Sequence, residues 1–171
     1  MSIASLVGQM ALGVCLQLAS VAETAPNAIP VFVPVQEFTL AWQHSIEKVR
    51  WEEDYQLRFG DYVESPLKAD FSNTKARVSK ECPQPLLFAK EARIKGSAAG
   101  MEPPEGAVFK QGWYHYKPVI SEHLELRLTR SEFVPDYEWC DQAGCRSLAE
   151  ILPSDGGVTL MWACAAPQDE N

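Results

Sequence analysis

The sequence is short of positive charge, with 15 Lys and Arg residues against 23 Asp and Glu residues and a formal net charge of −8. Residues 101–171 contain 5 basic and 12 acidic side chains, so this part of the chain offers no basic surface to a nucleic acid. The same deficit argues against a polybasic membrane-binding surface. We therefore expect neither a nucleic acid nor an anionic membrane surface as a partner.

Several signatures of catalysis and cofactor binding are also missing from the sequence. It contains no G-x-S-x-G turn that would expose a nucleophilic serine, and no Walker-type phosphate loop. The cysteines lack the spacing of zinc fingers or ribbons, and the three histidines have no ligand spacing. We therefore predict no catalytic residue, no metal and no cofactor.

Charged residues are absent from the first 22 positions, where an apolar stretch runs over residues 3–22. Ser20 and Ala22 would occupy the −3 and −1 positions of a signal-peptide cleavage site, so an export signal removed after Ala22 is predicted. Because a membrane-spanning helix needs about 20 apolar residues, an uncleaved inner-membrane anchor is the alternative. Both interpretations place the protein in the periplasm or elsewhere outside the cytoplasm, with membrane contact only through this segment.

Cysteine is present at five positions, and Cys15 would leave with the signal. An oxidising compartment favours disulfides among the rest, which are Cys82, Cys140, Cys145 and Cys164. The turn at 141–144 would place Cys140 and Cys145 opposite each other, which predicts a bridge between them. Pairing of either one with Cys164 is the alternative.

Hydrophobic residues make up 46% of the chain and follow a two-residue period typical of strands. A β domain is predicted at 37–166, after a connector at 23–36 and before a tail at 167–171, with an inserted loop at 65–85. Its strands are predicted at 37–46, 51–62, 87–95, 107–110, 113–116, 123–130, 137–140 and 158–163, with one short helix at 147–152. This pattern predicts an all-β fold, a small antiparallel β-barrel or sandwich, with an N-terminal signal or anchor helix at 1–22.

The first two strands are predicted to form a hairpin through a turn at 47–50, which pairs Ile46 with Trp51 and His44 with Glu53. One face of the hairpin is then aromatic and aliphatic, and the other is polar. His44 and Glu53 would face each other on the apolar side, where burial requires them to form a hydrogen bond.

A buried His–Glu pair has three interpretations. It can fix the register of the hairpin, take part in small-molecule binding, or act as part of a general base. Neither Ser45 nor Glu47 completes a triad with His44, because neighbouring residues of a strand point to opposite faces and Glu47 opens the turn.

A loop rich in small residues follows at 96–106 and includes Gly96, Ser97, Gly100 and Met101. Such a backbone lets a ligand approach closely, and its exposed N–H groups can bind an anion. A tight loop across the end of a barrel is the alternative.

Two segments carry a family resemblance, WQHSIEKVRWEEDY at 42–55 and EARIKGSAAGM at 91–101. They resemble the His-Ser-Val-Glu and Gly-Ala-Gly-Met signatures of a bacterial family of small exported proteins, domain of unknown function 1850. The likeness spans about residues 38–164, with Ile46 in place of the usual Val and with the inserted loop that carries Cys82. The motif positions are His44, Glu47, Glu53, Gly100 and Met101.

Members of this family are often encoded beside the fused permease and the solute-binding protein of TAXI-type TRAP transporters. The resemblance therefore implies an exported, non-enzymatic accessory protein that assists uptake of an organic acid or similar solute. Its partner would be the permease, the solute-binding protein or a small ligand. A periplasmic hydrolase-like enzyme that uses the His44–Glu53 pair, and a purely structural envelope protein, are the alternatives.

Overall fold

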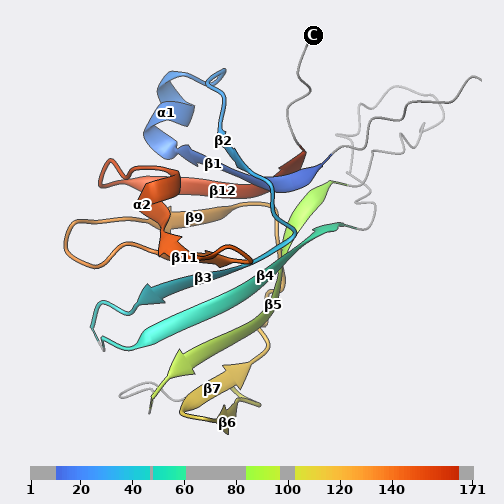
Figure 1. Cartoon of the computed structure of the whole chain (residues 1–171), viewed down its shortest axis with the longest axis vertical. Coiled ribbons are helices and arrows are strands. Elements are labelled where there is room, and N and C mark those ends of the chain that lie inside the picture. The colour runs from blue at the N-terminus through green and yellow to red at the C-terminus, as the bar shows by residue number, and fades with distance from the viewer. Residues whose placement is uncertain (1–10, 47, 61–83, 97–102, 166–171) are drawn as a thin grey trace, which may run out of the picture.

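The computed structural model describes residues 11–46, 48–60, 84–96 and 103–165, most of which lie in two antiparallel sheets (Figure 1). The smaller sheet has four strands in the order β2 (Val31–Val33), β1 (Leu12–Leu18), β12 (Val158–Ala165) and β9 (Leu126–Thr129). Two short helices complete the regular structure, α1 (Ala19–Thr24) and α2 (Leu148–Ile151).

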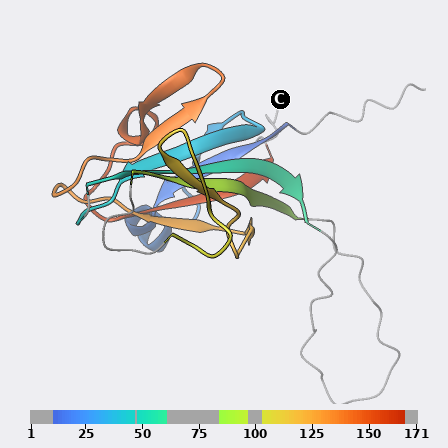
Figure 2. The same cartoon turned by 90° about the horizontal axis from the view of Figure 1, so that it is seen from below.

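The larger sheet has eight strands. Seven follow one another in the order β11 (Gly144–Ser147), β10 (Glu138–Asp141), β3 (Glu37–Gln43), β4 (Arg50–Phe59), β5 (Pro85–Lys95), β7 (Trp113–Tyr116) and β6 (Val108–Lys110). The eighth, β8 (Glu122–His123), pairs with β5 beside this path. Figure 2 shows the long strands β4 and β5 running side by side.

The core lies between the two sheets. It joins Val14, Leu16 and Met161 of the smaller sheet to Phe38 and other apolar residues of the larger sheet, and burial of this surface is the main stabilising contribution. The larger sheet extends beyond the smaller one as far as β7 and β6 (Figure 1). The all-β prediction is confirmed, and across the described residues the form is two open sheets packed as a sandwich rather than a closed barrel.

The apolar N-terminal segment differs from the prediction, because residues 12–18 form a strand instead of a signal or anchor helix. β1 lies between β12 and β2, with Val14 and Leu16 fully buried. Cys15, which was expected to leave with a signal, forms a disulfide with Cys164, with an S–S distance of 2.05 Å. Within the described residues, no helix is long and apolar enough to cross a membrane.

The first hairpin has the predicted faces but a different register. Trp42 lies opposite Trp51 and Leu40 lies opposite Glu53, so the predicted pairing of His44 with Glu53 is wrong by four residues. The connection spans 44–49 instead of 47–50, and the His44 N–H donates to the Val49 carbonyl oxygen at 2.9 Å. A shift by an even number of residues keeps every side chain on its face, and for this reason the apolar side was predicted correctly.

Candidate functional site

A group of aromatic side chains surrounds one carboxylate on the core-side face of the hairpin. We call it the Glu53 cluster, and it consists of Trp42, Trp51, Glu53, Tyr55, Tyr116 and Tyr137. The strands β3, β4 and β7 supply all of them except Tyr137, which directly precedes β10. Apart from the buried Tyr55, all members are half-buried, so they retain access to solvent.

Small side chains make room for the cluster on the neighbouring strand. Ala92 of β5 lies opposite Glu53 on one side and opposite Tyr116 on the other, so these three residues form one row across the sheet. A β-bulge between Asp54 and Tyr55 shifts the register by one residue and brings Ala89 opposite Tyr55. Ala89 and Ala92 therefore leave space around the Glu53 carboxylate that larger side chains at these positions would fill.

The aromatic rings form a continuous wall along the hairpin. The Trp42 ring centroid lies 6.1 Å from that of Trp51 and 5.9 Å from that of Tyr137, with ring planes tilted by 31° and 49°. The His44 ring stacks on Trp51 at a centroid distance of 5.6 Å. His44 is thus a neighbour of the cluster through Trp51, and not through the predicted pairing with Glu53.

Glu53 accepts a hydrogen bond inside the cluster, and its charge affects the pKa values of the three tyrosines around it. The Tyr55 hydroxyl donates a hydrogen bond to Glu53 Oε2. Burial is the largest cause that raises the pKa of Tyr55, Tyr116 and Tyr137, and the negative charge of Glu53 raises each further. The three phenols therefore stay protonated at neutral pH and can donate hydrogen bonds, as Tyr55 does to Glu53. The indole Nε1–H of Trp51 is another donor, buried and without an acceptor among the described residues.

A cleft of about 490 Å³ adjoins the cluster and shares Trp42 and Tyr137 with it. It forms because β10 pairs with β3 only over residues 39–41, and beyond Ala41 the two chain segments separate. The remaining lining residues are Ala41, Gln43, Arg50, Pro135, Asp136, Glu138 and Ser147. The cleft therefore combines two aromatic walls with charged side chains.

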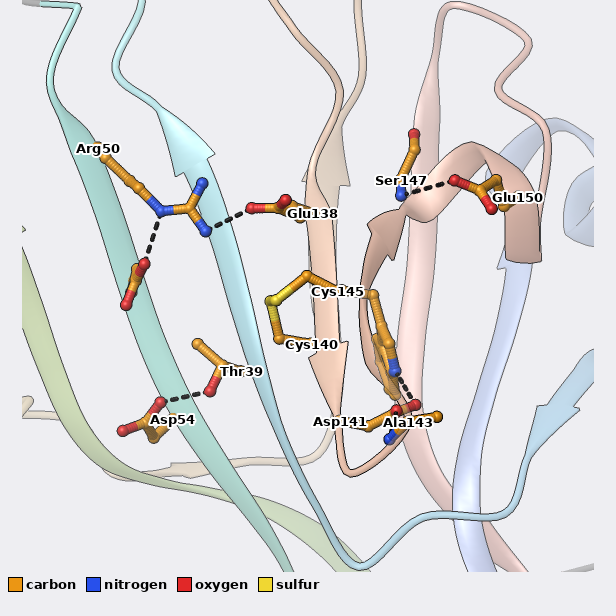
Figure 3. Close-up of a disulfide and its surroundings, with 12 residues drawn as sticks. Thr39, Arg50, Asp54, Glu138, Cys140, Asp141, Ala143, Cys145, Ser147 and Glu150 are labelled. Carbon is orange, nitrogen blue, oxygen red and sulfur yellow. Dashed lines mark hydrogen bonds and ion pairs between the residues drawn. A yellow bond between two sulfur atoms is a disulfide. The ribbon is translucent and has the colours of Figure 1, made fainter.

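The opposite face of the same hairpin carries a network of paired charges. Arg93 contacts Glu52 and Asp54, each at 2.6 Å, and Arg50 contacts Glu52 at 2.6 Å. Figure 3 shows Arg50 reaching Glu138 on β10, and Asp54 accepting a hydrogen bond from the Thr39 hydroxyl. These contacts tie β10, β3, β4 and β5 together.

This network leads to a prediction for Glu52, which accepts from both Arg50 and Arg93 and whose side chain is only 13% exposed. Replacement Glu52→Gln is expected to lower the free energy of unfolding by about 1–2 kcal/mol, because two charge-assisted bonds lose their acceptor charge. The matched control is Glu125→Gln, whose exposed ion pair with Arg127 contributes about 0–1 kcal/mol. Urea unfolding monitored by fluorescence measures both, and equal effects would contradict the prediction.

The second disulfide lies beside this network and confirms the predicted hairpin bridge. Cys140 of β10 lies directly opposite Cys145 of β11, with a Cα–Cα distance of 4.0 Å and an S–S distance of 2.04 Å (Figure 3). The alternative pairing of either one with Cys164 is excluded, since Cys164 bonds Cys15. Cys82 lies outside the described residues.

Of the other predicted site residues, the structure describes only Gly96. Gly96 follows β5 with a φ of 90°, and its N–H donates to the Gly112 carbonyl oxygen at 2.9 Å, directly beyond the last pair of β5 with β7. Glu47, Ser97, Gly100 and Met101 lie outside the described residues.

Sequence reasoning missed Tyr116 and Tyr137 as members of the site. The only signal was the aromatic density of 113–116, and nothing in a single sequence indicates that this segment lies two strands from Glu53.

Comparison with known proteins gives one family match. The family model described as Domain of unknown function (DUF1850) matches residues 75–148. The match supports this family. It includes the second motif, at 91–101, and the cleft residues from Pro135 to Ser147, whereas the hairpin motif lies outside it. No curated protein and no solved structure gives a significant match to the chain.

Proposed function

We propose that this protein is a non-enzymatic binding protein located outside the cytoplasm, where it serves as an accessory of a TAXI-type TRAP solute transport system. The observation that carries the binding role is the Glu53 cluster with its adjoining cleft, a half-buried group of ring faces and hydrogen-bond donors around one carboxylate. Such a combination of apolar surface and a few placed polar groups is typical of ligand sites.

The chemistry of the cluster favours holding a ligand over transforming one. Protonated phenols with raised pKa values donate hydrogen bonds but are poor bases at neutral pH. The motif resemblance supports the transporter association, and the family match supports the family on which that association depends. The two disulfides are compatible with an oxidising compartment outside the cytoplasm.

Copurification tests the accessory role. Tagged full-length protein, expressed in a host that also carries a TAXI-type permease and its solute-binding protein, is expected to bring one of them down from mild detergent extracts. A matched bait with Trp42→Ala and Tyr137→Ala reports whether the cleft walls are part of the contact. Repeated recovery of neither transporter component by the unaltered protein would overturn the proposal.

A further inference from the structure

The two faces of the first hairpin differ in how their carboxylates are neutralised. On the outer face, Glu52, Asp54 and Glu138 each contact an arginine. In the cleft, Asp136 is paired with Arg130 at 2.6 Å. Glu53 is different, because no Lys, Arg or His in the described part of the chain forms an ion pair with it, and the hydroxyl of Tyr55 is its hydrogen-bond donor.

A half-buried carboxylate without a counter-ion is costly, since burial removes part of its hydration and nearby phenols compensate only part of the charge. The surroundings of Glu53 are also unusual in composition. Aromatic rings from Trp42, Trp51 and Tyr137 line this part of the sheet, and their tilted planes present ring faces in more than one direction. Ring faces attract cations through the quadrupole of the π-system.

From this arrangement we propose that the Glu53 cluster and its cleft bind the ammonium group of a small organic cation. The proposal rests on the binding role proposed above and names the class of ligand. The carboxylate of Glu53 supplies the counter-charge, the rings of Trp42, Trp51 and Tyr137 contact the alkyl groups on the nitrogen, and a cleft of about 490 Å³ accommodates the rest of a small molecule. An organic acid, the solute class expected from sequence, is disfavoured here because its carboxylate would meet Glu53.

A set of three probes with one shape and different charge tests the class of ligand. Choline carries the cation, its carbon isostere with a quaternary carbon in place of nitrogen is neutral, and the carboxylate with the same tert-butyl head is an anion. Binding to the full-length protein is measured by titration calorimetry and by tryptophan fluorescence. Choline is expected to bind at least about tenfold more tightly than the neutral isostere, with no saturable binding of the anion.

Substitutions assign the preference to the cluster. Glu53→Gln keeps the shape and removes the charge, so the affinity for choline is expected to fall about tenfold, to that of the neutral isostere, whose own affinity stays unchanged. The matched control is Glu91→Gln, which removes a carboxylate from the outer face of β5, where Glu91 pairs with His115, and it should leave choline binding as it is. Because Glu53→Gln can fail to fold, the pair Tyr137→Phe and Tyr137→Leu gives a second test, with choline preference retained by the first and reduced by the second.

Any of four results would overturn the proposal. One is equal binding of choline and the neutral isostere, another is tighter binding of the anion, and the third is a loss in Glu91→Gln as large as that in Glu53→Gln. Absence of saturable choline binding by the folded protein overturns it as well. Copurification with a transporter component under the same conditions would then leave the accessory role in place and remove only the ligand class.

Discussion

Replacing Cys15 and Cys164 together with alanine is expected to lower the free energy of unfolding by about 5 kcal/mol. The two residues are 149 positions apart in sequence, so their bond restricts nearly the whole unfolded chain. In the folded state the bond joins β1 to β12, two central strands of the smaller sheet. Urea unfolding of the oxidised proteins gives the difference.

The matched control is the double alanine variant at Cys140 and Cys145, which are only five positions apart. Its expected loss is about 2 kcal/mol, because the entropy of closing a loop grows with the logarithm of its length. Equal losses in the two double variants would contradict the argument, as would an unchanged stability when Cys15 and Cys164 are replaced.

The same strand conflicts with the predicted cleavage after Ala22. Cleavage there would remove β1 with Cys15, expose the buried face of β12 and leave Cys164 without its partner. The structure therefore predicts that the folded protein retains residues 12–22. Intact mass after reduction measures this, and a stable, folded protein that begins at Glu23 would contradict the placement of β1.

The misassigned N-terminus shows where periodicity is uninformative. Strands with one solvated face, such as β4, alternate polar and apolar residues and were predicted from that pattern. β1 buries four consecutive residues, Gly13 to Leu16, so both of its faces are covered, and its sequence LGVCLQL lacks this alternation. A short apolar run of this kind is compatible with a buried strand and with part of a helix, and its position at the N-terminus favoured the second.

The hairpin shows a different limit. Alternation determines which face each residue occupies but permits any even shift between the strands. The register depends on the backbone of the connection, where Lys48 adopts a φ of 56°, a conformation that non-glycine residues rarely adopt. The residue types in 44–49 do not indicate that conformation. For this reason the sequence pattern placed the turn at 47–50, whereas the connection spans 44–49.

Only the part of the candidate site that lies on the first hairpin was predictable from the sequence. Glu53 was correctly placed on the apolar face, because its position follows from alternation alone. Tyr116 and Tyr137 reach it through the order of strands β7, β5, β4, β3 and β10, which brings together residues far apart in sequence. Pairings at such separation are not encoded in local patterns, so the aromatic surroundings of Glu53 became visible only in the fold.

The second large effect is expected at Arg130, whose side chain is only 1% exposed and makes four hydrogen bonds. It donates to both carboxylate oxygens of Asp136 at 2.8 and 2.6 Å, to the Leu152 carbonyl oxygen at 2.8 Å, and to the Thr159 hydroxyl at 3.2 Å. Arg130→Met is expected to lower the free energy of unfolding by about 3–5 kcal/mol, because Asp136 then keeps a partly buried charge without its partner. The control Arg127→Met, exposed at 61%, should stay within about 0.5 kcal/mol of the unaltered protein.

The pH dependence of stability provides an independent test of the same contact. Burial acts to raise the pKa of Asp136, but the hydrogen bonds and charge of Arg130 outweigh it and hold the pKa below its ordinary value of 3.8. Since the folded-state pKa is lowered, the stabilisation from this pair is fully present above pH 3.8 and is lost as the pH falls through the folded-state value. Removing Arg130 removes the cause of the lowered pKa. The difference in stability between the unaltered protein and Arg130→Met should therefore shrink in acid, and a difference that stays constant between neutral pH and acid would show that Arg130 acts through packing and not through its pairing with Asp136.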